Sequence, residues 1–233
     1  MTLVYVPEGE FTMGSDSDPD EQPIHKVNLN AYWIDQTEVT NAMYDRCVDE
    51  KKCRPPMAIT SNTRQYYFYD PALGNYPVIY VSWNDANAYC SWIGRRLPTE
   101  AEWEKAARGT DGRTYPWGSD EPDGTFLNVD LADTTEAGQY PQGASIYGAL
   151  DMAGNVYEWV ADWYHADYYQ DSPASNPLGP ENAIDPNFGQ LRVLRGGSWY
   201  KLDGGVRSTD RYQNGIRFNS SFVGFRCALS TTP

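Results

Sequence analysis

The sequence has 233 residues, a formal net charge of −14 and many aromatic residues (8 Trp, 18 Tyr and 7 Phe). This length suffices to bury a sizeable core, and the aromatic content argues against a disordered chain. The excess of carboxylates argues against a nucleic-acid partner because it repels phosphates, and no apolar run reaches the roughly 20 residues of a membrane span. We therefore expect one domain over residues 1–233 that is monomeric when isolated.

The N-terminal part of the chain is predicted to form strands and one helix. Residues 1–36 alternate between apolar and polar side chains on both sides of an acidic loop, DSDPDEQP. They show no signal-peptide pattern, so we expect a domain cut from a longer protein. Thr40 is the expected N-cap of a helix over Asn41–Glu50. Residues 51–80 are rich in proline and tyrosine and are predicted to be irregular.

Two further helices have clear start and stop signals. Ser82 is the expected N-cap of a helix over residues 83–94, with Asp85 at its third position and Gly94 as its stop. Thr99 and Glu102 form a capping box at the start of the next helix, which ends at residues 108–109. The apolar stripe of that helix consists of Trp103 and the alanines that follow, so these signals indicate an α+β domain.

The rest of the chain is predicted to be mostly loops. Turn sequences (YPWG, SDEPDG and YPQGAS) fill residues 109–151, and another loop covers residues 167–190. We expect a strand at LRVLRGGSW and a last strand at SSFVGFRCALS. Loops this long in a compact domain usually serve a function or bind an ion.

Four cysteines allow three disulfide pairings. Cys47 and Cys53 are close enough in sequence for a local bridge, and Cys90 and Cys227 would then join the middle of the chain to its C-terminal end. The alternative is four buried free thiols, whereas a zinc site is disfavoured because the sequence has no CxxC motif. The disulfides would favour an extracytoplasmic location.

Six separated motifs resemble the formylglycine-generating enzyme (sulfatase-modifying factor) family. They are VYVPEGEFTMGS, VSWNDANAYCSWIGRRLPTEAEWEKAARG, YPWG, YGALDMAGNVYEWVADWY, RVLRGGSW and GFRCA, and they come in the family's order over nearly the whole chain. The resemblance implies one compact α+β domain with a C-type-lectin-like fold, little regular secondary structure and long loops. It also implies a bridge between Cys90 and Cys227.

The family's copper chemistry needs two cysteines that this chain lacks. The resemblance places Lys201 and Val206 at these positions, and neither offers the soft thiolate that copper(I) prefers. Ser198 is retained, but Tyr157 and Phe222 replace a tryptophan and an asparagine. We therefore expect no copper and no catalytic residues of this type.

No other catalytic constellation stands out in the sequence. The two histidines, His25 and His165, lie far apart, so they suggest neither an iron site nor a catalytic base with a nearby partner. The sequence also lacks the GxSxG motif of a serine hydrolase.

The resemblance implies a calcium site in LDMAGNVYEW. Its ligands would be Asp151, the carbonyls of Gly154 and Val156, and Glu158; calcium prefers such hard oxygen ligands. Asp151 stands where the enzyme has asparagine. The alternative is a turn in which backbone amides satisfy a buried Glu158.

A second structural calcium ion would be held by Asn128 and the carbonyl of Val129. The acidic half of that site is shortened in this chain, so Asp130 or Asp133 would have to complete it. We therefore expect one or two structural calcium ions.

Without the copper cysteines, the C-terminal segment is predicted to be a displayed recognition surface, because its tyrosines, arginines and asparagines are typical of binding surfaces. The alternative is that these are ordinary solvated positions. The candidate ligand-binding residues are Tyr200, Lys201, Asp203, Arg207, Asp210, Arg211, Tyr212, Asn214 and Arg217.

We thus expect a calcium-stabilised, non-catalytic recognition or sensor module that binds a protein, peptide or small ligand through residues 200–222. The element CVDEKKCRPP resembles those of family modules attached to bacterial protein kinases. The alternative is a metal-dependent oxidoreductase, of the formylglycine-generating or a related thiol-oxidising type, with an altered active site.

Overall fold

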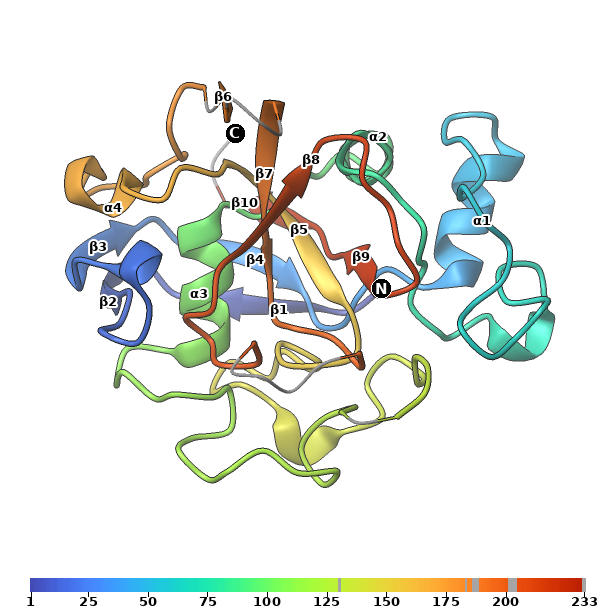
Figure 1. The fold of residues 1–233 in the computed structure, drawn as a ribbon, viewed down its shortest axis with the longest axis horizontal. Helices are drawn as coiled ribbons and strands as arrows, with labels where there is room; N and C mark the ends of the chain where they lie inside the picture. The colour runs from blue at the N-terminus through green and yellow to red at the C-terminus, as the bar shows by residue number, and fades with distance from the viewer. Residues whose placement is uncertain (130, 183, 186–188, 201–204, 232–233) are drawn as a thin grey trace.

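The fold is mixed, with short strands, short helices and long connections (Figure 1). The structure, a computed structural model, describes residues 1–129, 131–182, 184–185, 189–200 and 205–231. Within these residues no helix has the length and apolar character needed to cross a membrane. The elements are β1 (Leu3–Val6), β2 (Gly9–Met13), β3 (His25–Leu29), β4 (Tyr32–Asp35), α1 (Asn41–Asp49), α2 (Trp83–Trp92), α3 (Glu100–Arg108), β5 (Tyr157–Trp163), α4 (Tyr168–Asp171), β6 (Ile184–Asp185), β7 (Gly189–Arg195), β8 (Tyr212–Gly215), β9 (Val223–Phe225) and β10 (Ala228–Ser230).

The strands form three small sheets. β4 lies between β1 and β10 in one antiparallel sheet, and β2 and β3 form an antiparallel pair. The third sheet has the order β6-β7-β5-β9, with β8 paired to β7 and with β5 parallel to β9. Of these sheets, the one formed by β1, β4 and β10 pairs strands from both ends of the sequence.

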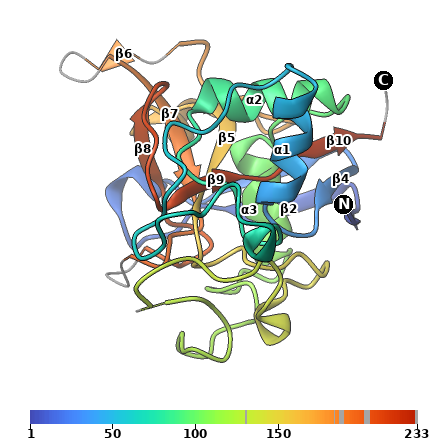
Figure 2. The same ribbon diagram turned by 90° about the vertical axis from the view of Figure 1, so that its right-hand side faces the viewer.

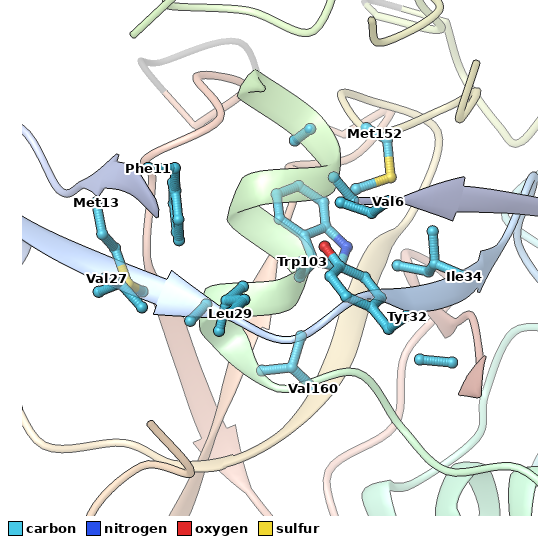
Figure 3. Close-up of a cluster of buried hydrophobic side chains, with 14 of the residues drawn as sticks. Val6, Phe11, Met13, Val27, Leu29, Tyr32, Ile34, Trp103, Met152 and Val160 are labelled. Carbon is cyan, nitrogen blue, oxygen red and sulfur yellow. The ribbon is translucent and has the colours of Figure 1, made fainter. Parts of the chain in front are cut away.

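Helix α3 lies at the centre of the molecule, between the β2–β3 pair and the sheet that contains β5 and β7 (Figure 1). Its Trp103 is fully buried among apolar side chains from β1 to β4, as Figure 3 shows for Val6, Phe11 and Tyr32. The sequence predicts one apolar stripe, but every residue of the helix is buried. The charged residues are accommodated by internal partners: the Lys105 ammonium, for example, donates to two backbone carbonyls, each at 2.8 Å.

A second apolar cluster surrounds the two disulfides. Helices α1 and α2 lie side by side there (Figure 2). The Cys47–Cys53 disulfide closes the end of α1, and the Cys90–Cys227 disulfide joins α2 to the connection between β9 and β10. These are the pairs that the sequence analysis favours, and they account for all four cysteines.

The three predicted N-cap residues lie at the N-cap positions of α1, α2 and α3. Ser82 and Thr99 both form complete capping boxes, with Asp85 and Glu102 as their partners. Thr40 lies at the N-cap position of α1 but forms no side-chain capping bond.

The predicted last strand is in fact two strands in different sheets. β9 pairs with β5, and β10 pairs with β4. Between them Arg226 is fully buried against Glu158, and Cys227 is bonded to Cys90. The ion pair and the disulfide hold the residues between β9 and β10, where the chain passes from one sheet to the other. The short strand β8 and the single turn of α4 also have no counterpart among the predicted elements.

Candidate functional site

The turn after β7 brings distant segments together. Gly196 and Gly197 both have positive φ, 91° and 72°. A Cβ at Gly196 would lie 3.0 Å from Trp103, and one at Gly197 would collide with the carbonyl of Gly205, so glycine permits both close approaches. Ser198 is buried, and its hydroxyl accepts the Tyr200 N–H at 3.3 Å. The Ser198 side chain therefore braces the backbone of this turn.

A buried arginine–glutamate network supports the segment that follows. Arg195 pairs with Glu104 at 2.6 Å and with Glu100 at 3.3 Å, and its side chain is fully buried. Arg211 pairs with Glu100 at 2.7 Å, and Arg108 pairs with Glu104 at 3.1 Å. Each glutamate therefore contacts two arginines, which offsets the cost of burying its charge. These five residues are referred to below as the arginine–glutamate network.

Three of the predicted ligand-binding residues point inward rather than outward. The Arg211 side chain is fully buried in the arginine–glutamate network. Arg207 is 15% exposed and contacts Asp18, Glu21 and Asp210. Burial raises the pKa of Asp210 to about 7, although Arg207 opposes this rise. The structure therefore places Arg207, Asp210 and Arg211 as braces between the C-terminal segment, the acidic loop and α3.

Aromatic side chains of the same segment and of β5 form a partly exposed surface. Tyr212 stacks on Tyr157, with ring centroids 5.0 Å apart, and Tyr200 stacks on Phe222 at 5.7 Å. The Tyr157 and Phe222 rings meet edge to face at 6.3 Å, so the two stacks are continuous, and Phe218 lies 6.2 Å from Phe222. Tyr200 is 65% exposed and Tyr212 is 40% exposed. These five residues are called the aromatic surface below.

A cavity of about 390 Å³ adjoins the aromatic surface. It is lined by Gln190 and by residues 214–218, which include the predicted ligand-binding residues Asn214 and Arg217. Arg217 is exposed and Asn214 is partly exposed. Two other predicted residues, Lys201 and Asp203, lie outside the described residues.

Another cavity, of about 360 Å³, has no counterpart among the sequence predictions. Leu97 and Leu178 contribute to its lining, together with the ion pair of Arg96 and Glu102. Its walls come from segments spread over the chain, so no local motif marks it.

A buried acidic pair lies at the start of the predicted calcium loop. Asp151 is nearly fully buried, has φ of +55°, and faces the fully buried carboxyl of Glu38 within hydrogen-bonding distance. Burial and the facing Asp151 raise the pKa of Glu38 well above its usual value, and burial also raises the pKa of Asp151. Asn155 donates to Glu38 Oε1 at 2.9 Å, whereas Glu38 Oε2 is buried without a hydrogen-bond partner.

Glu158, at the other end of this loop, has a counter-ion. Arg226 donates through Nε and Nη2 to its two carboxylate oxygens, each at 2.7 Å. Trp103 Nε1 donates at 2.8 Å. Side chains rather than backbone amides therefore satisfy Glu158.

At the second predicted calcium position, too, some oxygens accept hydrogen bonds and others have no partner. Asn128 donates to the carbonyl of Asp133 and to Asn155 Oδ1, each at 3.0 Å, while Asn128 Oδ1 is buried without a partner. Burial alone would raise the pKa of Asp133, but hydrogen bonds from Ser61 and Thr63 bring it below its usual value. Asp133 therefore joins its own loop to the loop that contains Ser61 and Thr63. Asp130 lies outside the described residues.

Comparison with known proteins decides the family. The sequence profile of the sulfatase-modifying factor enzyme 1-like domain matches residues 1–231. The chain belongs to this family. The structure of PvdO from Pseudomonas aeruginosa is similar, with a TM-score of 0.80 at 26% identity, over 98% of this chain and 94% of that one. This likeness agrees with the C-type-lectin-like α+β fold that the motifs imply.

Relatives in the family carry different names. Serine/threonine-protein kinase Pkn1 of Chlamydia trachomatis is 38% identical over 97% of this chain, which spans only 38% of that kinase. The formylglycine-generating enzyme of Streptomyces coelicolor is 35% identical, over 97% of this chain and 88% of that protein. The inactive C-alpha-formylglycine-generating enzyme 2 of Bos taurus is 33% identical, over 98% of this chain and 85% of that protein.

The two positions at which the resemblance places the family's copper ligands, Lys201 and Val206, offer no thiolate for a copper ion. Val206 is buried in an apolar cluster with Leu127 and Ala153, and valine has no donor atom. Lys201 lies outside the described residues, and its ammonium repels a cation. All four cysteines are in disulfides. No thiolate is therefore present to hold copper(I).

Two buried oxygens have no hydrogen-bond partner at or beside the calcium positions that the resemblance implies. The unpartnered buried oxygens of Glu38 and Asn128 are hard ligands of the kind that calcium prefers. Of the described residues, the acidic cluster with ligand atoms within 4.8 Å of one another is Asp18, Glu21 and Asp210, and Arg207 already occupies it. No sequence motif marks Glu38, which is a single glutamate after a strand.

Proposed function

We propose that the chain is a calcium-stabilised, non-catalytic recognition module that binds a protein, peptide or small ligand through residues 200–222. The observation that carries this proposal is the aromatic surface, because Tyr200 and Tyr212 present large exposed rings that Phe222 and Tyr157 hold in place. Rigid aromatic side chains give contact area at a low cost in conformational entropy.

Hydrogen bonds and ion pairs anchor the segment that leads to Tyr212. Arg195 donates to the carbonyls of Ser208 and Thr209, each at 2.9 Å, and thereby anchors the segment to the arginine–glutamate network. A binding surface that is ordered before the ligand arrives loses less entropy on binding. We therefore narrow the proposed contact set to the aromatic surface and the adjoining Asn214 and Arg217.

The chemistry at the copper positions supports a non-catalytic role. The chain has no thiol outside its disulfides, and Val206 is part of an apolar cluster. That a relative is named an inactive formylglycine-generating enzyme points in the same direction. The kinase relative, which is much longer than this chain, suggests that such a domain serves as a sensor attached to a larger protein. The two disulfides favour an extracytoplasmic position for it.

The calcium part of the proposal rests on the open oxygens near Asp151 and Asn128. A bound calcium ion supplies positive charge and oxygen coordination to loops that have little secondary structure of their own. The residues that would hold it lie in the Asp151–Glu158 loop and, at the second position, around Asn128 and Val129. The ion's role would be structural.

Binding is tested by selecting binders from a random peptide display library on the disulfide-intact domain. Selected peptides should bind a Tyr200→Ala/Tyr212→Ala variant at least tenfold more weakly, while Tyr66→Ala, a control at a tyrosine that is 72% exposed, leaves affinity unchanged. Peptides that bind all three proteins equally would refute the assigned surface. Copper near one atom per chain, with oxygen consumption in the presence of a cysteine peptide, would instead establish the oxidoreductase alternative.

A further inference from the structure

Glu158 is not available to bind a cation in the arrangement that the structure shows. Both of its oxygens accept hydrogen bonds from Arg226, and Trp103 donates a third bond. Both side chains of the Glu158–Arg226 pair are buried. If Glu158 turned towards an ion, Arg226 would be left as a buried charge without its partner, which is strongly unfavourable.

Arg226 has no donor left for other carboxylates. Its Nη1 donates to the carbonyls of Asp35 and Gln36, each at 3.1 Å, and its Nη2 donates to the carbonyl of Leu150 at 2.8 Å as well as to Glu158. With Nε also bound to Glu158, all five N–H groups are used.

Among the described residues, the Glu38–Asp151 pair therefore has no hydrogen-bonded counter-ion. Asp151 accepts the Gly138 N–H through Oδ2, and Glu38 accepts an Asn155 N–H through Oε1. The Glu38 carboxyl lies within hydrogen-bonding reach of Asp151, and its Oε2 is buried without a hydrogen-bond donor. Two buried carboxyls in contact require either a shared proton or a cation.

We propose that Glu38, rather than Glu158, is the second carboxylate ligand of the calcium ion at Asp151. This inference rests on the calcium ion of the proposed function. Calcium takes six to eight oxygens, so an ion between these two carboxylates satisfies Glu38 Oε2 and leaves the Glu158–Arg226 ion pair intact. In this arrangement Glu158 neutralises Arg226, and Glu38 takes the place of Glu158 as a calcium ligand.

This assignment also links the two candidate ion positions. Asn155 donates to Glu38 Oε1 and accepts from Asn128 Nδ2, so it connects the two side chains whose other oxygens lack partners. Glu38 lies between β4 and α1, so an ion shared with Asp151 ties the N-terminal part of the chain to the loop before β5.

The test is a calcium titration by isothermal calorimetry on chelator-treated, disulfide-intact protein, together with thermal melts in chelator and in calcium chloride. Glu38→Gln should weaken calcium binding at least tenfold and abolish the calcium-dependent rise in melting temperature. Without calcium this variant should melt above the wild type, because its amide can donate to Asp151. Glu10→Gln is the matched control, since it removes the same charge from an exposed glutamate.

Two results would overturn the inference, and they are distinguishable. If the wild type binds calcium and Glu38→Gln binds it equally well, Glu38 is not a ligand, although the calcium part of the proposed function stands. If the wild type shows neither heat of binding nor stabilisation by calcium, this inference and the calcium part of the proposed function both fail. Glu158→Gln adds a second comparison. If the Glu158→Gln variant does not fold, the Glu38→Gln result alone decides.

Discussion

Replacing Arg195 by methionine tests the role of the arginine–glutamate network. The change removes two contacts with carboxylates, Glu104 at 2.6 Å and Glu100 at 3.3 Å. It also removes the N–H groups that satisfy the carbonyls of Ser208 and Thr209. Breaking a buried ion pair from one side costs about 3–5 kcal/mol. Because each glutamate keeps a second arginine, we expect about 3 kcal/mol, near the lower end of that range.

The assay is guanidinium denaturation followed by circular dichroism, with the disulfides intact. Arg54→Met is the control, because Arg54 pairs with Asp85 but is 77% exposed, and such pairs contribute at most about 1 kcal/mol. Arg195→Lys should recover only part of the loss, since an ammonium cannot bridge two carboxylates and two carbonyls as a guanidinium does. A loss below about 1 kcal/mol, or one no larger than that of Arg54→Met, would refute the argument.

Three other outcomes are expected. Replacing Cys90 and Cys227 by alanine should lower the free energy of unfolding by up to about 5 kcal/mol, whereas replacing Cys47 and Cys53 should lower it by about 2 kcal/mol. The difference is expected because the Cys90–Cys227 bond closes a far longer loop. Equal losses would contradict this entropic account. Burial and the neighbouring glutamates raise the pKa of Asp162 to about 8, so its favourable contribution is complete below about pH 4 and is lost as the pH rises through 8. Asp162→Asn should therefore gain stability over the wild type as the pH rises from 4 to 8, by at most about 5 kcal/mol, and parallel stability curves would disprove this. Treatment with a calcium chelator should lower the melting temperature, with recovery on adding calcium but not magnesium; an unchanged melting curve would count against the structural ion.

Local sequence signals predicted the local structure well. The capping boxes at Ser82 and Thr99 depend only on residues within one helical turn, and both helices begin where those residues place them. The alternation in residues 1–36 predicted strands, which the structure confirms as β1 to β4. The Cys47–Cys53 pair likewise depends on a short separation along the chain.

Features that depend on contacts between distant segments could not be predicted in the same way. Arg207 and Arg211 resemble exposed recognition residues in composition, but their carboxylate partners lie in the acidic loop and in α3. The last predicted strand divides because Arg226 and Cys227 have partners far away in the sequence. Glu38 acquires its significance only when the fold brings it to Asp151.

The sheet formed by β1, β4 and β10 determines how the domain would bear a pulling force. β1 and β10 flank β4, with Leu3 opposite Asp35 and Ser230 opposite Tyr32, so the first and last strands emerge at opposite ends of the sheet. Tension applied through these two strands would act along them and load their hydrogen bonds in shear, all at once rather than one after another. The disulfide just before β10 would carry part of this load directly to α2. A load between the first and last strands would therefore be borne by this sheet and by the Cys90–Cys227 disulfide.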